Sequence, residues 1–111
     1  MIAIAFSKKK LRSLCEIQIK AEREYGIRVA KALRTRLAEL RVAESLLELP
    51  AGRPREVNGA PFKNYAVELA DGYRLILGVN HGDVPVLESG GVNWARVDRV
   101  KVLKIEVSHG R

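Results

Sequence analysis

Two side chains on neighbouring predicted strands could act on a phosphate. Arg74 lies in an apolar strand (YRLIL), and His109 follows the β-branched strand RVKVLKIEV, which opens the stretch 99–111. The planar guanidinium of arginine matches phosphate oxygens, and histidine exchanges a proton near neutral pH. In a small basic chain this pair suggests chemistry on a phosphate. The competing interpretations are a solvated Arg74 paired with Glu68, and a His109 that belongs to a frayed tail.

The sequence lacks the other familiar patterns of a chemical site. One cysteine, Cys15, and two widely spaced histidines do not match any zinc-ligand spacing. There is no P-loop, no GxGxxG and no recognisable Ser-His-Asp assembly. We therefore expect neither a metal nor a cofactor. A single cysteine also excludes an intramolecular disulfide, which fits a reducing cytoplasm.

The net charge of +7 is concentrated in one part of the chain. Residues 8–36 contain ten Lys or Arg and three Glu, so this segment holds the whole excess and the remainder is neutral. Positive charge favours polyanions, and it also favours acidic protein partners. The blander interpretation is a solvated helical face, and the alternative is a contact with ribosomal RNA.

The length of 111 residues predicts one domain, residues 1–111. The apolar stretch 2–6 is too short for a signal peptide, and the lysines follow it instead of preceding it. No run approaches the roughly 18 apolar residues of a membrane span. We expect a soluble, cytoplasmic protein with no membrane partner.

The first half of the chain predicts a strand followed by two helices. Residues 2–6 form a short apolar strand, and Ser7 is placed to cap the next helix. Helical spacing predicts one helix up to residue 25, closed by Gly26 as a left-handed cap. A second, antiparallel helix from residue 27 would turn its leucines inward, Leu47 among them.

The second half predicts a β-hairpin and a central strand. Prolines and glycines indicate a loop over residues 49–62. Residues 65–69 and 73–79 alternate as strands around an Asp-Gly turn. Residues 84–97 are ambiguous, with at most a short edge strand near Val86. The near-continuous apolar run 100–107 indicates a central strand.

These elements predict an α+β domain with the order β-α-α-β-β-(β)-β. Two helices should cover one face of a mainly antiparallel sheet and leave the other face partly open. Tyr73, Leu75 and Leu77 share one face of their strand, so Arg74 points to the opposite one. If the three apolar residues pack under the helices, Arg74 faces the open concavity.

That order, together with four sequence segments, resembles the RelE/ParE superfamily of bacterial toxin–antitoxin toxins. The segments are FSKKKLRSL, LPAGRPREV, YAVELADGYRLIL and VDRVKVLKIEVSHG, and the resemblance covers nearly the whole chain. The HigB-like "killer protein" branch is the most similar. The resemblance implies a small RelE-like fold with a four-stranded, mainly antiparallel sheet.

The resemblance also implies an activity and its partners. Such toxins cleave messenger RNA on the ribosome without a metal, and so inhibit translation. The partner would be a cognate antitoxin, often a helix-turn-helix protein. The pair would bind operator DNA only through that antitoxin.

The family chemistry fits the residue types of this chain. The RNA 2′-hydroxyl attacks the adjacent phosphorus, while a base, a cation and an acid assist. Arg74 matches the family's strand arginine and would clamp the phosphate, and His109 matches its terminal histidine as acid or base. Arg53, Arg55 and Lys63 lie in or beside a loop where the family keeps further basic residues, and they would hold RNA. A mobile basic loop is the plainer interpretation of the two arginines.

The sequence departs from the family before its terminal histidine. Val107 and Ser108 stand where Asp-Tyr is expected. The family tyrosine stacks on a base or helps proton transfer, so another aromatic, Tyr65, Tyr73 or Trp94, would have to supply the stacking. Two alternatives therefore stay open. One is a non-enzymatic, ParE-like inhibitor of DNA gyrase, and the other is an inactive member that only binds its antitoxin.

Overall fold

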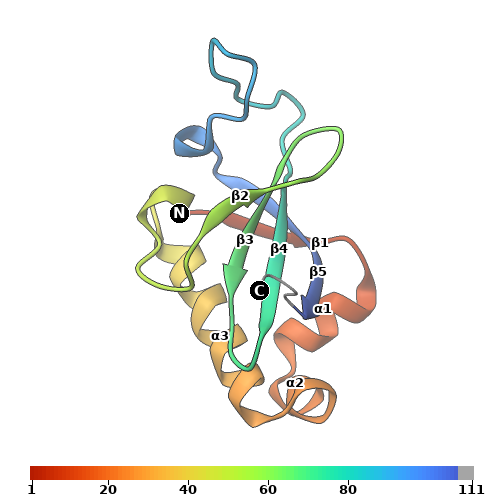
Figure 1. Ribbon diagram of the computed structural model, residues 1–111. Helices are drawn as coiled ribbons and strands as arrows, with labels where there is room; N and C mark the ends of the chain where they lie inside the picture. Colours follow the sequence, from red (N-terminus) through yellow and green to blue (C-terminus); the bar gives the residue numbers. More distant parts are fainter. Residues whose placement is uncertain (108–111) are drawn as a thin grey trace.

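A five-stranded sheet forms the centre of the computed structural model, which describes residues 1–107 (Figure 1). The strand order is β1-β5-β4-β3-β2; β1 runs parallel to β5, and the other neighbours are antiparallel. The strands are β1 (Ala3–Phe6), β2 (Arg55–Val57), β3 (Asn64–Glu68), β4 (Tyr73–Val79) and β5 (Arg99–Val107). The α+β class and the central place of β5 are confirmed. The expectation of four strands is wrong, because β2 adds a fifth.

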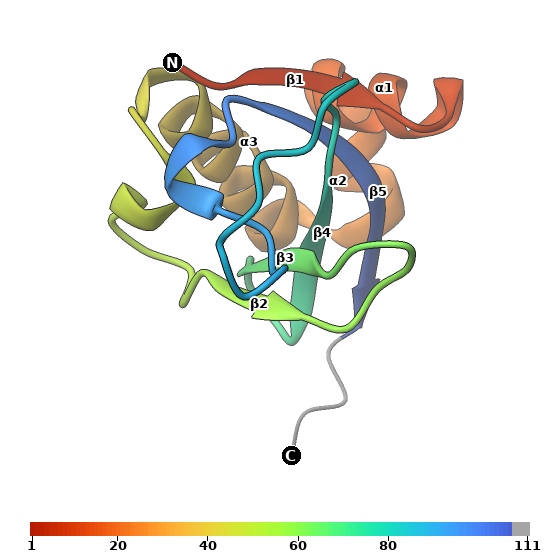
Figure 2. The ribbon, with the colours of Figure 1, turned by 90° about the horizontal axis from the view of Figure 1, so that it is seen from above.

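Three helices lie together on one side of this sheet, which curls from β1 round to β2 (Figures 1 and 2). They are α1 (Lys9–Glu16), α2 (Gln18–Tyr25) and α3 (Ile27–Val42). The prediction of two helices is wrong, because the first one is interrupted at Ile17, whose φ of −115° and ψ of 103° are extended. A β-branched residue has reduced helix propensity, which makes this a favourable place for the break.

The predicted role of Ser7 as helix cap is also wrong. Lys8 occupies the N-cap position of α1 without a side-chain cap, and the Ser7 hydroxyl donates instead to the carbonyl oxygen of Leu103 at 3.2 Å. Ser7 therefore ties the end of β1 to β5. Gly26 does join α2 to α3 at a positive φ of 94°, but its ψ of 164° lies outside the left-handed helical region.

The hydrophobic core fills the space between the helices and one face of the sheet. Leu33, Leu37 and Leu40 of α3 are fully buried against residues such as Leu75 and Leu77 of β4. The expectation for Leu47 is wrong, since its side chain is 60% exposed. Its neighbour Leu46 is buried instead, because the chain leaves α3 and turns into the short 3-10 helix η1 (Leu46–Glu48).

The predicted loop over residues 49–62 contains the edge strand β2. Pro54 directly precedes β2. Proline has no backbone N–H to donate, and this is tolerated beside an edge strand, which pairs on one side only. Pairing with β3, and not local propensity, makes these three residues a strand. The edge strand expected near Val86 is absent from the described sheet, where Val86 makes only an isolated bridge to Val92.

The β3–β4 hairpin matches its prediction. Asp71 and Gly72 both have positive φ, 54° and 81°, and the Tyr73 N–H donates to the Ala70 carbonyl across the turn. Leu75 and Leu77 face the core, so Arg74, which directly precedes Leu75, lies on the open face as expected. A β-bulge in β5 shifts the register, so that Ile76 pairs with Lys104 but Leu77 pairs with Val102.

None of the helices within residues 1–107 combines the length and the apolar character that crossing a membrane requires.

Candidate functional site

Arg74 lies on the open face between two glutamates. Strand pairing places it opposite Glu68 on β3 and opposite Glu106 on β5. Its Nε donates to Oε2 of Glu106 at 2.7 Å, and its Nη2 lies 2.6 Å from the same oxygen. The Arg74 side chain is 23% exposed. The predicted catalytic arginine is therefore held by a carboxylate, and its partner is Glu106 and not the expected Glu68.

Glu106 is itself held by two cations. Lys104 Nζ lies 3.1 Å from Oε1, so each oxygen of the Glu106 carboxylate has one positively charged partner. Burial acts to raise the pKa of Glu106, but hydrogen bonds from Arg74 and Lys104, together with their charges, lower it below its usual value. Glu106 is consequently ionised near neutral pH and holds Arg74 in place.

The two loop arginines gather at the other glutamate. Arg55 Nη2 lies 3.1 Å from Oε2 of Glu68, and Arg53 Nη1 lies 3.9 Å from the same oxygen. Arg55 also donates to the carbonyl oxygen of Arg53, whose backbone has a φ of 46°. A row of alternating charges, which we call the charge row, therefore crosses four strands: Arg55, Glu68, Arg74, Glu106 and Lys104.

Lys63, the third predicted RNA-binding residue, lies away from the charge row. It directly precedes β3, whereas Glu68 stands at the other end of that strand. At about 3.3 Å per residue, the five residue steps from Lys63 to Glu68 span about 16 Å. The structure thus brings Arg53, Arg55 and Arg74 together and leaves Lys63 at the opposite end of the same face.

His109 and Ser108 lie outside the described residues. The last described pairs of β5 join Glu106 to Arg74 and Val107 to Tyr73. His109, the second predicted catalytic residue, therefore comes three positions after Glu106 in the sequence.

Two of the aromatic residues expected to replace the family tyrosine are unavailable. Tyr65 and Trp94 are 5% and 7% exposed, and their rings pack together on the core side with centroids 4.7 Å apart. Trp94 also donates from Nε1 to Glu56, and its burial in the core confirms its interpretation as a hydrophobic anchor. Tyr73 packs edge-to-face against Tyr25 of α2, on the helical side. The prediction that Tyr65 or Trp94 stacks on a base is wrong.

The charge row has the donors that a phosphate requires. An arginine carries five N–H donors in a planar fork. Glu106 engages Nε and one N–H of Nη2, so three N–H groups of Arg74 remain for a second anion. Counting Arg53, four cations stand around two carboxylates, which leaves the patch positive. This patch can bind a phosphodiester while Glu106 fixes the orientation of Arg74.

Sequence reasoning missed Glu106 and Lys104. Their spacing of two residues was a usable signal, because alternate residues of a strand share a face. The bulge at Leu103 hides that signal, since it breaks the alternation of the strand just before Lys104. Parity counted from the apolar residues upstream therefore assigns these two side chains to the wrong face.

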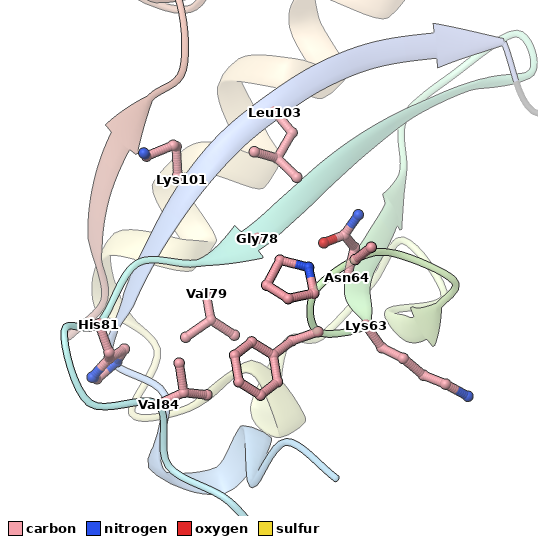
Figure 3. A pocket seen from close by; sticks show the side chains of 11 residues that line it. Lys63, Asn64, Gly78, Val79, His81, Val84, Lys101 and Leu103 are labelled. Atoms are coloured by element: carbon pink, nitrogen blue, oxygen red, sulfur yellow. The ribbon is translucent and has the colours of Figure 1, made fainter.

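The open face also carries a cavity, about 310 Å³ in volume, at the end of β4 farthest from Arg74 (Figure 3). Gly78 forms part of its floor, and Pro61, Phe62, Val79 and Val84 form apolar walls. A Cβ on Gly78 would come within 3.0 Å of Leu103 Cδ1. Any larger residue at position 78 would therefore displace Leu103 and reduce the depth of the cavity. No pattern in the sequence indicated this cavity.

Within residues 1–107, no three His, Cys, Asp or Glu side chains gather as metal ligands would. Comparison with protein-family models, with curated proteins and with solved structures finds no match.

Proposed function

We propose that this chain is the toxin of a type II toxin–antitoxin module, a RelE-like protein of the HigB branch that cleaves messenger RNA on the ribosome without a metal. One observation carries the proposal. Arg74 meets Arg53, Arg55 and Lys104 on the sheet face that the helices leave open. The element order and the sequence segments described above support the same family.

In the proposed reaction the RNA 2′-hydroxyl attacks the adjacent phosphorus. The P–O bond to the 5′-oxygen breaks, giving a 2′,3′-cyclic phosphate and a free 5′-hydroxyl. Arg74 stabilises the extra negative charge of the phosphorane, and Glu106 orients its guanidinium. The lowered pKa of Glu106 makes it a poor proton acceptor, so proton transfer falls to His109. Arg53, Arg55 and Lys63 hold the RNA backbone.

The proposal includes the expected partners and location. The toxin acts in the cytoplasm on ribosome-bound messenger RNA and is silenced by a cognate antitoxin, of the helix-turn-helix type. Operator DNA is contacted only through that antitoxin. The basic segment 8–36 offers a second positive surface, formed by the helices, for the ribosome.

The test is cleavage of a defined transcript on purified ribosomes, mapped by primer extension. The wild-type protein should create discrete new 5′ ends, and Arg74→Ala should remove them. Arg74→Lys should recover only part of the activity, because lysine lacks the planar fork. Arg41→Ala is the charge-matched control at the exposed end of α3, and it should cleave normally. Intact transcripts with a folded wild-type protein would overturn the proposal.

A second candidate is a non-enzymatic inhibitor of DNA gyrase, as in the ParE-like branch. The observation that favours it is the engagement of Arg74 by Glu106, which leaves less of the guanidinium free for a reacting phosphate. This candidate predicts loss of supercoiling by purified gyrase and no cleavage of transcripts. Normal supercoiling at saturating protein would eliminate it.

A further inference from the structure

We infer that the cavity at the far end of β4 is a binding site for one unpaired nucleobase of the RNA. This inference rests on the proposed function, because it names a second contact of the same substrate. The cavity and the charge row lie on the same face of β4, separated by the four residue steps from Arg74 to Gly78. That distance is about 13 Å at about 3.3 Å per residue.

The shape and the lining of the cavity suit a flat aromatic ligand. Its volume of about 310 Å³ is at the lower end of the roughly 300–1,000 Å³ range of small-molecule sites, as a single base requires. Phe62 is 38% exposed and forms one wall. Pro61, Val79 and Val84 line the same cavity as Phe62. An exposed aromatic ring beside an apolar hollow provides a stacking surface for any base.

The polar groups at the rim favour a nucleic acid over other flat ligands. Lys63 and Lys101 stand there, and the Lys63 side chain extends outward (Figure 3). The eleven lining residues, all in the described part of the chain, include no Asp or Glu. A base held against Phe62 would therefore have its flanking phosphates near ammonium groups. The Asn64 amide offers both donors and acceptors for the edge of a base.

The spacing makes the two contacts compatible with one short strand. At the stacked rise of about 3.4 Å per nucleotide, 13 Å corresponds to about four nucleotides, and to fewer in an extended strand. The base in the cavity would thus lie a few nucleotides from the phosphate held by Arg74. This arrangement also assigns a role to Lys63, which is too far from Arg74 to share its phosphate.

The experiment measures the binding of a short RNA of about six nucleotides, with 2′-O-methyl groups that prevent cleavage. Each position in turn is replaced by an abasic residue, and every RNA is titrated against wild type and Phe62→Ala. One abasic position should weaken binding to the wild type about 10-fold, and Phe62→Ala should weaken binding of the intact RNA by a similar factor. The same abasic RNA should bind Phe62→Ala no more weakly than the intact RNA does.

Two further variants separate stacking from other effects. Phe62→Trp keeps an aromatic face and should retain most of the affinity, whereas Phe62→Leu should lose nearly as much as Phe62→Ala. Ile27→Ala is the control, because Ile27 is 71% exposed at the start of α3. It should bind RNA like the wild type.

The inference is overturned if Phe62→Ala binds the intact RNA with full affinity. It is also overturned if each abasic substitution weakens binding to Phe62→Ala as much as it weakens binding to the wild type. It is also overturned if the wild type binds none of these RNAs. Each of these results leaves the cleavage assay with Arg74→Ala to decide the proposed function on its own. The binding and cleavage assays together therefore distinguish a nuclease that lacks a base-binding cavity from a protein that is not a nuclease.

Discussion

The pair formed by Arg74 and Glu106 should contribute to stability in a way that depends on pH. At an effective dielectric constant of about 20, two unit charges about 4 Å apart attract by about 4 kcal/mol. The two side chains are 23% and 27% exposed, and Lys104 continues to partner Glu106 when Arg74 is removed. Both facts reduce the coupling, which we expect to be about 1–2 kcal/mol at neutral pH.

The assay is a double-mutant cycle by urea unfolding with Arg74→Gln, Glu106→Gln and the double variant. The pKa of Glu106 is lowered in the folded state, so its contribution is fully present above the unfolded value, near 4.5, and disappears as pH falls through the lower, folded value. The coupling energy should therefore decline as the pH is lowered below about 4.5 and the carboxyl group becomes protonated.

A matched pair serves as the control. Arg28 and Asp71 are 3.0 Å apart, but their side chains are 77% and 49% exposed. The same cycle there should give no more than about 0.5 kcal/mol. If the Arg74–Glu106 coupling is as small as this, or does not change between neutral and acid pH, then the assignment of the charge row as a fixed network is refuted.

Three other predictions concern the core, the hairpin and the cysteine. Leu77→Ala removes a fully buried side chain and should lower the free energy of unfolding in urea by about 2–5 kcal/mol. Gly72→Ala, at a φ of 81°, should cost about 1–2 kcal/mol, whereas Gly82→Ala, also in open space but without positive φ, should change the thermal midpoint little. Burial raises the pKa of Cys15 to about 11, so at about pH 8 a disulfide reagent should label it about 100-fold more slowly in the folded than in the urea-unfolded protein.

Local sequence signals predicted the β3–β4 hairpin because its geometry is determined within the segment itself. Asp71 and Gly72 accept positive φ, and the alternation of the flanking residues sets the faces. The side of the sheet on which Arg74 lies follows directly from that alternation. In contrast, β2 is a strand only because β3 offers it a partner, and no pattern over three residues can indicate that.

The candidate site was only partly predictable for the same reason. Arg53, Arg55 and Arg74 could be named from their residue types, since arginine suits phosphate wherever it lies. Their meeting at Glu68 and Glu106 depends on the register of four strands and on the bulge at β5. The cavity beside Phe62 depends on the path of a loop between β2 and β3, which the sequence leaves undetermined.

The parallel pairing of β1 with β5 has a consequence for the order in which the fold can form. β1 is made first during synthesis, yet its only partner in the described sheet begins at Arg99, so Ala3–Phe6 must wait for nearly the whole length of the described chain. Pairings across such a distance make folding slow relative to a chain of local contacts. The charge row also requires β5, which supplies Glu106 and Lys104. An incompletely translated chain therefore has neither the complete sheet nor the charge row, and both can form only after β5 has been synthesised.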